Sequence, residues 1–163
     1  VDSKVLNLAM SDFVWDSVAE YFPQGEQTLQ GINLVEFTDF DAEALADRVD
    51  QFSRHLDGVA AAGGRSFAHT IARGRSQVNQ IWAMRKRAVG LLGGVAGAKK
   101  PVAFVEDTCV PPENLAAFIG EFREVLDAHD LDYGMFGHVD AGVLHVRPLL
   151  DLKAPESMPM IRE

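Results

Sequence analysis

At 163 residues the chain has the length of one domain, and its balance of 47% hydrophobic and 24% charged residues is that of a globular protein rather than a disordered one. The net charge of −9, from 24 acidic and 15 basic residues, argues against a nucleic-acid-binding protein. A single cysteine excludes a disulfide framework, and the lack of a long apolar stretch or signal-peptide pattern favours a cytoplasmic protein with no membrane span.

In chain order, the predicted elements are helix 11–22, strand 32–38, helix 42–56, strand 65–72, helix 76–92, strand 101–107, helix 113–129 and strands 132–139 and 143–146. The helices follow from apolar residues at helical spacing, and Ser11-Asp12 supplies an N-cap for the first of them. The strands follow from their content of Ile, Val and Phe.

This order predicts the fold class. Strand, helix and strand occur twice, separated by helix 76–92, which indicates a ferredoxin-like α+β fold with an antiparallel sheet and helices on one face. The other sheet face would be open and would need a ligand, another copy of the chain or a further domain to cover it. We expect a helix and loop at 1–30, an α+β core at 31–152 and a truncated tail at 153–163.

The two ends of the chain suggest a segment of a longer protein. The chain begins at Val1 without an initiator methionine, and it stops at Glu163 without a turn or a cap. We therefore expect a single domain taken from a larger protein.

The last two predicted strands carry the pattern that best indicates chemistry. If Ala141-Gly142 is a two-residue turn, His138 lies directly opposite His145, with Cβ atoms about 4.5–5.5 Å apart. Two imidazoles so placed can share a divalent metal such as zinc, copper, iron or nickel, although a third ligand must come from elsewhere. The alternative is two histidines with no role as ligands.

The same register separates the side chains of the hairpin into two faces. The predicted core face holds Tyr133, Met135, Val139, Leu144 and Val146. The predicted open face holds Gly134, Phe136, His138, His145 and Arg147. The polar groups of the hairpin therefore gather on the open side of the sheet.

Two further features have both a functional and a structural interpretation. Arg85 falls on the apolar stripe of helix 76–92, where its guanidinium must either clamp a substrate carboxylate or pair with a nearby acid. Glu106-Asp107 could do acid–base work as a pair, but we favour the simpler view that Asp107 turns the chain toward the helix that Pro111 opens.

Three segments in order resemble a known family. They are Trp82 to Lys86 (WAMRK), Ala103 to Leu115 (AFVEDTCVPPENL) and Tyr133 to Pro148 (YGMFGHVDAGVLHVRP). Over roughly residues 30–155 the chain resembles the C-terminal domain of FAD-linked oxidases, the group that includes glycolate oxidase, D-lactate dehydrogenase and D-2-hydroxyglutarate dehydrogenase. The likeness is greatest to large bacterial members that also carry an iron–sulfur region.

The resemblance implies a substrate-binding cap domain of an FAD-dependent enzyme that oxidises a 2-hydroxy acid by hydride transfer to flavin. A separate N-terminal domain would bind the FAD. Arg85 matches a family arginine that holds a substrate carboxylate, and His138 and His145 match two zinc ligands that are completed by a Glu and a His beyond Glu163. An iron–sulfur cluster would lie outside this chain, because Cys109 alone cannot hold one.

The chain also departs from the family pattern. Arg147 replaces an Asn, Val89 a Thr and Val105 a Lys, while the GDGN run reads Asp140 to Val143 (DAGV). Arg147 is therefore expected to share in binding the substrate carboxylate. Two other functions remain open: a stand-alone ligand-binding or regulatory module that dimerises through its open sheet face, and a small metal-dependent hydrolase built on His138 and His145.

Overall fold

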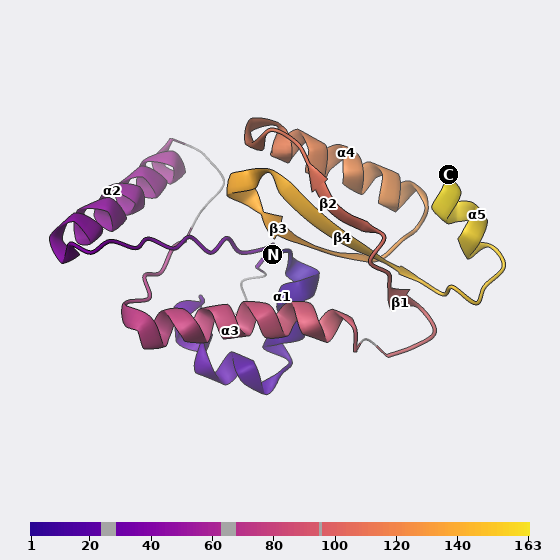
Figure 1. Cartoon of the computed structure of the whole chain (residues 1–163), viewed down its shortest axis with the longest axis horizontal. Helices are drawn as coiled ribbons and strands as arrows, with labels where there is room; N and C mark the ends of the chain where they lie inside the picture. The colour runs from indigo at the N-terminus through magenta and orange to yellow at the C-terminus, as the bar shows by residue number, and fades with distance from the viewer. Residues whose placement is uncertain (24–28, 63–67, 95) are drawn as a thin grey trace.

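Figure 1 shows the computed structural model of the chain, in which residues 1–23, 29–62, 68–94 and 96–163 are described. The α-helices are α1 (Ser3–Met10), α2 (Ala42–Ala61), α3 (Gly74–Leu92), α4 (Leu115–Ala128) and α5 (Ser157–Arg162). The strands are β1 (Lys100–Pro101), β2 (Val105–Cys109), β3 (Tyr133–His138) and β4 (Val143–Leu150). Short 3-10 helices are η1 (Phe13–Ser17), η2 (Ala19–Tyr21), η3 (Pro112–Asn114) and η4 (Val139–Ala141).

Among the described residues, every strand pair is antiparallel and involves β4. β3 pairs along one edge of β4. β2 pairs with the first half of β4, from Val143 to Val146, and β1 pairs with its last two residues, Leu149 and Leu150. The prediction of an α+β fold with an antiparallel sheet is therefore confirmed.

α4 covers one face of the sheet. Alternate residues of the hairpin point toward it, and the buried cluster there holds Leu126, Tyr133, Met135, Leu144 and Val146. The four strand residues of this cluster were predicted to face the core, because side chains alternate between the two faces of a strand. Burial of these apolar side chains is what fixes α4 against β3 and β4.

Helices also lie on the second face, which is more covered than the sequence suggested. α1 and α3 pack against each other and against Phe136 of β3, in a cluster with Val5, Ala9, Val18, Met84, Ala88 and Leu92. Gly134 permits this approach, since a Cβ built there would lie 2.7 Å from a methyl group of Leu92. The sheet thus lies between α4 and the α1–α3 pair (Figure 1).

The predicted helix at 11–22 is wrong. The first helix is α1, which Asp2 caps by accepting a hydrogen bond from the Val5 backbone N–H at 2.9 Å. Ser11 ends α1, and Asp12 caps the 3-10 helix η1 instead of an α-helix. The apolar positions that suggested one helix are divided between η1 and η2, and Val18, the residue between them, is fully buried.

Two of the predicted strands are not found in the sheet. Residues 32–38 are extended but outside any strand, and the Trp82 indole N–H donates to Glu36 at 2.6 Å, which ties this segment to α3. Phe37 instead packs against Phe52 of α2, with ring centroids 5.5 Å apart. Of the predicted strand 65–72, residues 65–67 lie outside the described residues and 68–72 form no strand.

The other predictions differ mainly in their bounds. Helices 42–56, 76–92 and 113–129 correspond to α2, α3 and η3 with α4. Strand 101–107 is divided into β1 and β2, and strand 143–146 extends to Leu150.

Within the described part of the chain, no helix is both long and apolar enough to cross a membrane.

Candidate functional site

The β3–β4 hairpin positions both histidines, in a register that differs from the prediction. The loop has four residues, the turn η4 followed by Gly142 at φ +66°, so His138 pairs with Val143 and His145 pairs with Phe136. The predicted direct opposition of His138 and His145 is therefore wrong. The cause is η4, which continues into residues 139–141 where the prediction extended the strand.

The two imidazoles nevertheless lie on the same sheet face and next to each other. The shift of register is two residues, which preserves the face of each residue that stays in β3 or β4. The ring centroids of His138 and His145 are 5.5 Å apart, with the rings nearly perpendicular. His138 is exposed at the end of β3, whereas the side chain of His145 is 12% exposed and lies beside Phe136.

Both predicted substrate-binding arginines lie against the same aromatic ring. The guanidinium carbon of Arg85, from α3, is 5.8 Å from the centroid of Phe136, and that of Arg147, from β4, is 5.2 Å from it. The face of an aromatic ring attracts cations, so Phe136 holds two guanidinium groups beside the histidines. The structure brings Arg85, Arg147 and His145 together around this ring, with His138 beside His145.

The two arginines differ in their pairing. Arg147 donates from Nε to Glu106 at 2.7 Å. Arg85 is partly buried, and it forms no ion pair with any acid of the described residues. The structural alternative for Arg85, pairing with a nearby acid, is therefore not seen in this part of the chain, and its guanidinium is available to an anion.

Glu106 is a site residue that the sequence analysis considered as half of an acid–base pair and then set aside in favour of a turn. It lies within β2, and its Oε2 is 2.9 Å from His145 Nδ1. This short approach is not aligned with the ring N–H, so it is an electrostatic contact rather than a directed hydrogen bond. The signal in the sequence was the Glu-Asp pair, but a strand expected to end at residue 107 favoured a turn at that point.

A β-bulge in β2 brings a second carboxylate to the same ring. Val105 pairs with Val146 and Thr108 with Leu144, so three steps along β2 match two along β4. Asp107 adopts φ +57° at the bulge, and its Oδ1 lies 3.4 Å from His145 Nδ1. The site thus combines two arginines, two histidines and two carboxylates.

The fit of this site to a metal can be tested from the donors present. His138 and His145 provide two imidazoles on one face, and the carboxylates lie at the Nδ1 side of His145. Among the described residues, no group of three or more His, Cys, Asp or Glu side chains is arranged to hold a metal ion. This chain therefore supplies two candidate ligands but not a closed zinc site.

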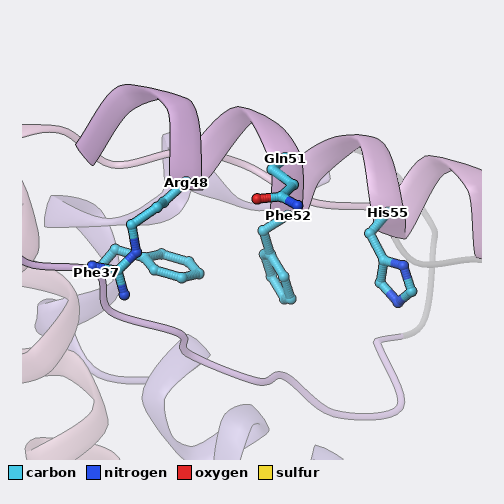
Figure 2. A pocket seen from close by; sticks show the side chains of 5 residues that line it. All are labelled: Phe37, Arg48, Gln51, Phe52 and His55. Carbon is cyan, nitrogen blue, oxygen red and sulfur yellow. The ribbon is translucent and has the colours of Figure 1, made fainter. Parts of the chain in front are cut away.

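A cavity of about 330 Å³ lies away from these residues, between α2 and the extended segment 32–38. Figure 2 shows the side chains that line it: Phe37, Arg48, Gln51, Phe52 and His55. The guanidinium among them, that of Arg48, is 3.4 Å from Asp39. None of the residues predicted to bind substrate or metal lines this cavity.

The fold and this site define a domain class. The chain belongs to the family described as FAD linked oxidases, C-terminal domain, whose profile matches residues 1–162. The family suggested by three sequence segments is thus confirmed.

Curated relatives refine the comparison. The chain is 52% identical over 163 residues to a D-2-hydroxyglutarate dehydrogenase of Pseudomonas putida, 50% identical over 165 residues to one of Escherichia coli, and 49% identical over 165 residues to one of Haemophilus influenzae. These alignments cover 99%, 100% and 100% of this chain. The chain spans only 16% of the length of each of these relatives.

Proposed function

We propose that this domain binds the substrate of an FAD-dependent oxidoreductase that acts on a 2-hydroxy acid of the D-2-hydroxyglutarate, D-lactate or glycolate type. The observation that carries the proposal is Arg85, a partly buried guanidinium beside Phe136 without an acidic partner in the described residues. An unpaired cation in such a place favours a ligand carboxylate. The family and the names of the relatives support the same reaction class.

The four predicted residues divide the work between the two ends of such a substrate. Arg85 and Arg147 would bind carboxylate oxygens, because a guanidinium offers paired N–H donors that match them. His138 and His145 would face the hydroxyl group, since they lie on the same sheet face as Arg147. Phe136 would keep water away from the bound carbon, as its ring is buried between the arginines and His145.

Oxidation of a 2-hydroxy acid removes a hydride from carbon and a proton from the hydroxyl. FAD, when bound by a domain that this sequence does not include, supplies the acceptor of the hydride. The residues of this chain orient the carboxylate, and an imidazole nitrogen accepts the hydroxyl proton. Alternatively, the two imidazoles would hold a divalent metal, with zinc as our proposal, which would lower the pKa of the hydroxyl so that water takes the proton. A metal would need further ligands from outside this sequence, as would an iron–sulfur cluster.

The test uses the full-length protein that contains this chain. We expect it to be isolated with flavin, and we expect D-2-hydroxyglutarate, D-lactate or glycolate to bleach the absorption of the oxidised flavin without oxygen. A flavin-free protein, or a flavin that none of the three acids reduces, would contradict the proposal.

The roles of the histidines need a separate measurement. We expect His138→Ala to lower activity, and the zinc content of the variant distinguishes the two roles. Loss of zinc together with activity supports a ligand, and loss of activity with zinc retained supports a proton acceptor. Wild-type activity and zinc in His138→Ala would remove this residue from the mechanism.

A cytoplasmic location and a homodimer remain predictions, and α1 and α3 already cover part of the face that a dimer would use.

A further inference from the structure

Glu106 contacts both a predicted substrate-binding residue and a histidine of the site. Its Oε1 accepts a hydrogen bond from Arg147 Nε at 2.7 Å, while its Oε2 lies 2.9 Å from His145 Nδ1. We propose that Glu106 is a positioning residue for the proposed reaction. It orients Arg147 toward the substrate and keeps His145 in the tautomer whose Nε2 carries no proton. This inference rests on the proposed function for its consequence in catalysis.

The contact with Arg147 leaves the useful part of the guanidinium free. Of its five N–H donors, the bond to Glu106 uses the one on Nε. The four N–H groups on the Nη atoms form no hydrogen bond or ion pair with the described residues. Glu106 therefore fixes the direction of the guanidinium while its outer edge stays available for a carboxylate.

The contact with His145 decides where a neutral ring carries its proton. A carboxylate accepts hydrogen bonds and cannot donate them, so the negative charge of Glu106 beside Nδ1 favours a proton on that nitrogen. Asp107 adds a second carboxylate oxygen on the same side at 3.4 Å. Nε2 then keeps its lone pair, which His145 needs whether it accepts the hydroxyl proton or binds a metal.

The backbone of β2 is shaped for this arrangement. Successive residues of a regular strand point to opposite faces, so Glu106 and Asp107 would not both reach one ring. The bulge between Val105 and Thr108 removes that restriction, and Asp107 adopts φ +57°, a left-handed conformation that aspartate adopts more readily than most residues other than glycine. A bulge that directs two carboxylates at one imidazole favours a role for them in the site.

The decisive variant is Glu106→Gln in the full-length holoenzyme. Arg147 Nε only donates, so the amide oxygen of the glutamine must face it and the amide NH₂ must face His145. A donor NH₂ beside Nδ1 favours a lone pair on that nitrogen, so the proton of a neutral His145 moves toward Nε2. We expect kcat to fall about 10- to 100-fold, the usual effect of changing such a partner of a functional histidine. KM should change little, because Arg147 keeps its acceptor.

Two further variants separate positioning from a merely structural role. Glu106→Ala removes the anchor of Arg147 as well, so KM should rise in addition to the fall in kcat. Glu121→Gln removes an exposed carboxylate of α4, and it should leave both constants unchanged. Equal kcat in Glu106→Gln and Glu121→Gln would overturn the proposal. So would a loss of flavin and of thermal stability in Glu106→Gln that accounts for all of its lost activity.

A measurement without turnover distinguishes failure of this inference from failure of the proposed function. ¹⁵N spectra of the full-length protein labelled at histidine, with the signals of His145 identified by their loss in His145→Gln, can assign the tautomer of His145 at a pH where the ring is neutral. We expect protonated Nδ1 in the wild type and protonated Nε2 in Glu106→Gln. Protonated Nε2 in the wild type would refute the role of Glu106 even in an active enzyme. An inactive enzyme with the expected tautomers would refute only the proposed function.

Discussion

Replacing Arg85 by lysine tests the interaction on which the proposed function depends. Lysine keeps the positive charge, but it loses the planar pair of N–H donors that matches a carboxylate. A hydrogen bond to a charged group contributes about 1.5–3 kcal/mol, and about 1.4 kcal/mol corresponds to a tenfold change in binding. Because Arg85 has no acidic partner in the described residues, this loss falls on the substrate. We expect KM to rise about 10- to 150-fold.

The assay is steady-state oxidation of the best 2-hydroxy acid by the full-length holoenzyme, with reduction of an artificial electron acceptor as the readout. Arg87→Lys is a matched control on the same helix. Arg87 forms a two-pronged hydrogen bond with Asp12, from Nε and Nη2 at 3.2 and 2.9 Å, and lies outside the site. We expect Arg87→Lys to leave KM unchanged. Equal KM values in Arg85→Lys and the wild type would show that Arg85 does not bind the substrate.

Two other predictions concern stability of the 163-residue chain in thermal melts. Gly137→Ala should lower the free energy of unfolding by about 3 kcal/mol or more, because the new Cβ would lie 2.1 Å from the Val143 carbonyl oxygen. Gly120→Ala, on the open surface of α4, should instead raise the free energy of unfolding by about 0.5–1 kcal/mol. Equal melting temperatures of the two variants would contradict this register. Hydrogen bonds from Arg87 lower the pKa of Asp12 below its ordinary value of 3.8, so their stabilising effect is present above that pH and is lost as the pH falls below it. As the pH falls through that range, Arg87→Ala should lose less stability than the wild type. Parallel curves of melting temperature against pH for the two proteins would show that the Asp12–Arg87 pair does not contribute.

Local patterns were sufficient for the elements that carry an apolar stripe or face, including α2, in which no residue is fully buried. α2, α3, α4 and the β3–β4 hairpin were all predicted, because their apolar residues recur at the spacing of the element that they form. The segment 32–38 has the composition of a strand but pairs with none. Strand propensity reports fit to a half-buried surface, and here the surface that Phe37 meets is Phe52 of α2.

The same limit explains which site residues were found. Arg85, Arg147, His138 and His145 are polar residues at positions where an apolar stripe or a strand pattern made them conspicuous. Glu106 had no such signal, because two acids at an expected strand end are typical of a turn. Only the pairing with β4 shows the bulge, and only the bulge places Glu106 and Asp107 beside one imidazole.

The hairpin shows why a wrong register still gave the right faces. A two-residue turn and the observed four-residue loop differ by an even number, so the residues that remain in β3 and β4 keep their predicted faces while their partners shift by two residues. Val139 is the exception: it was predicted to face the core, but it lies in η4 and is exposed. A three-residue loop would have separated His138 from His145. The observed loop needs Gly142, where φ is +66° and a Cβ would lie 1.8 Å from the Val110 carbonyl oxygen. Gly142 suggested a two-residue turn, but the structure requires a glycine there for another reason. The four-residue loop passes so close to the chain at the end of β2 that a side chain at this position would not fit.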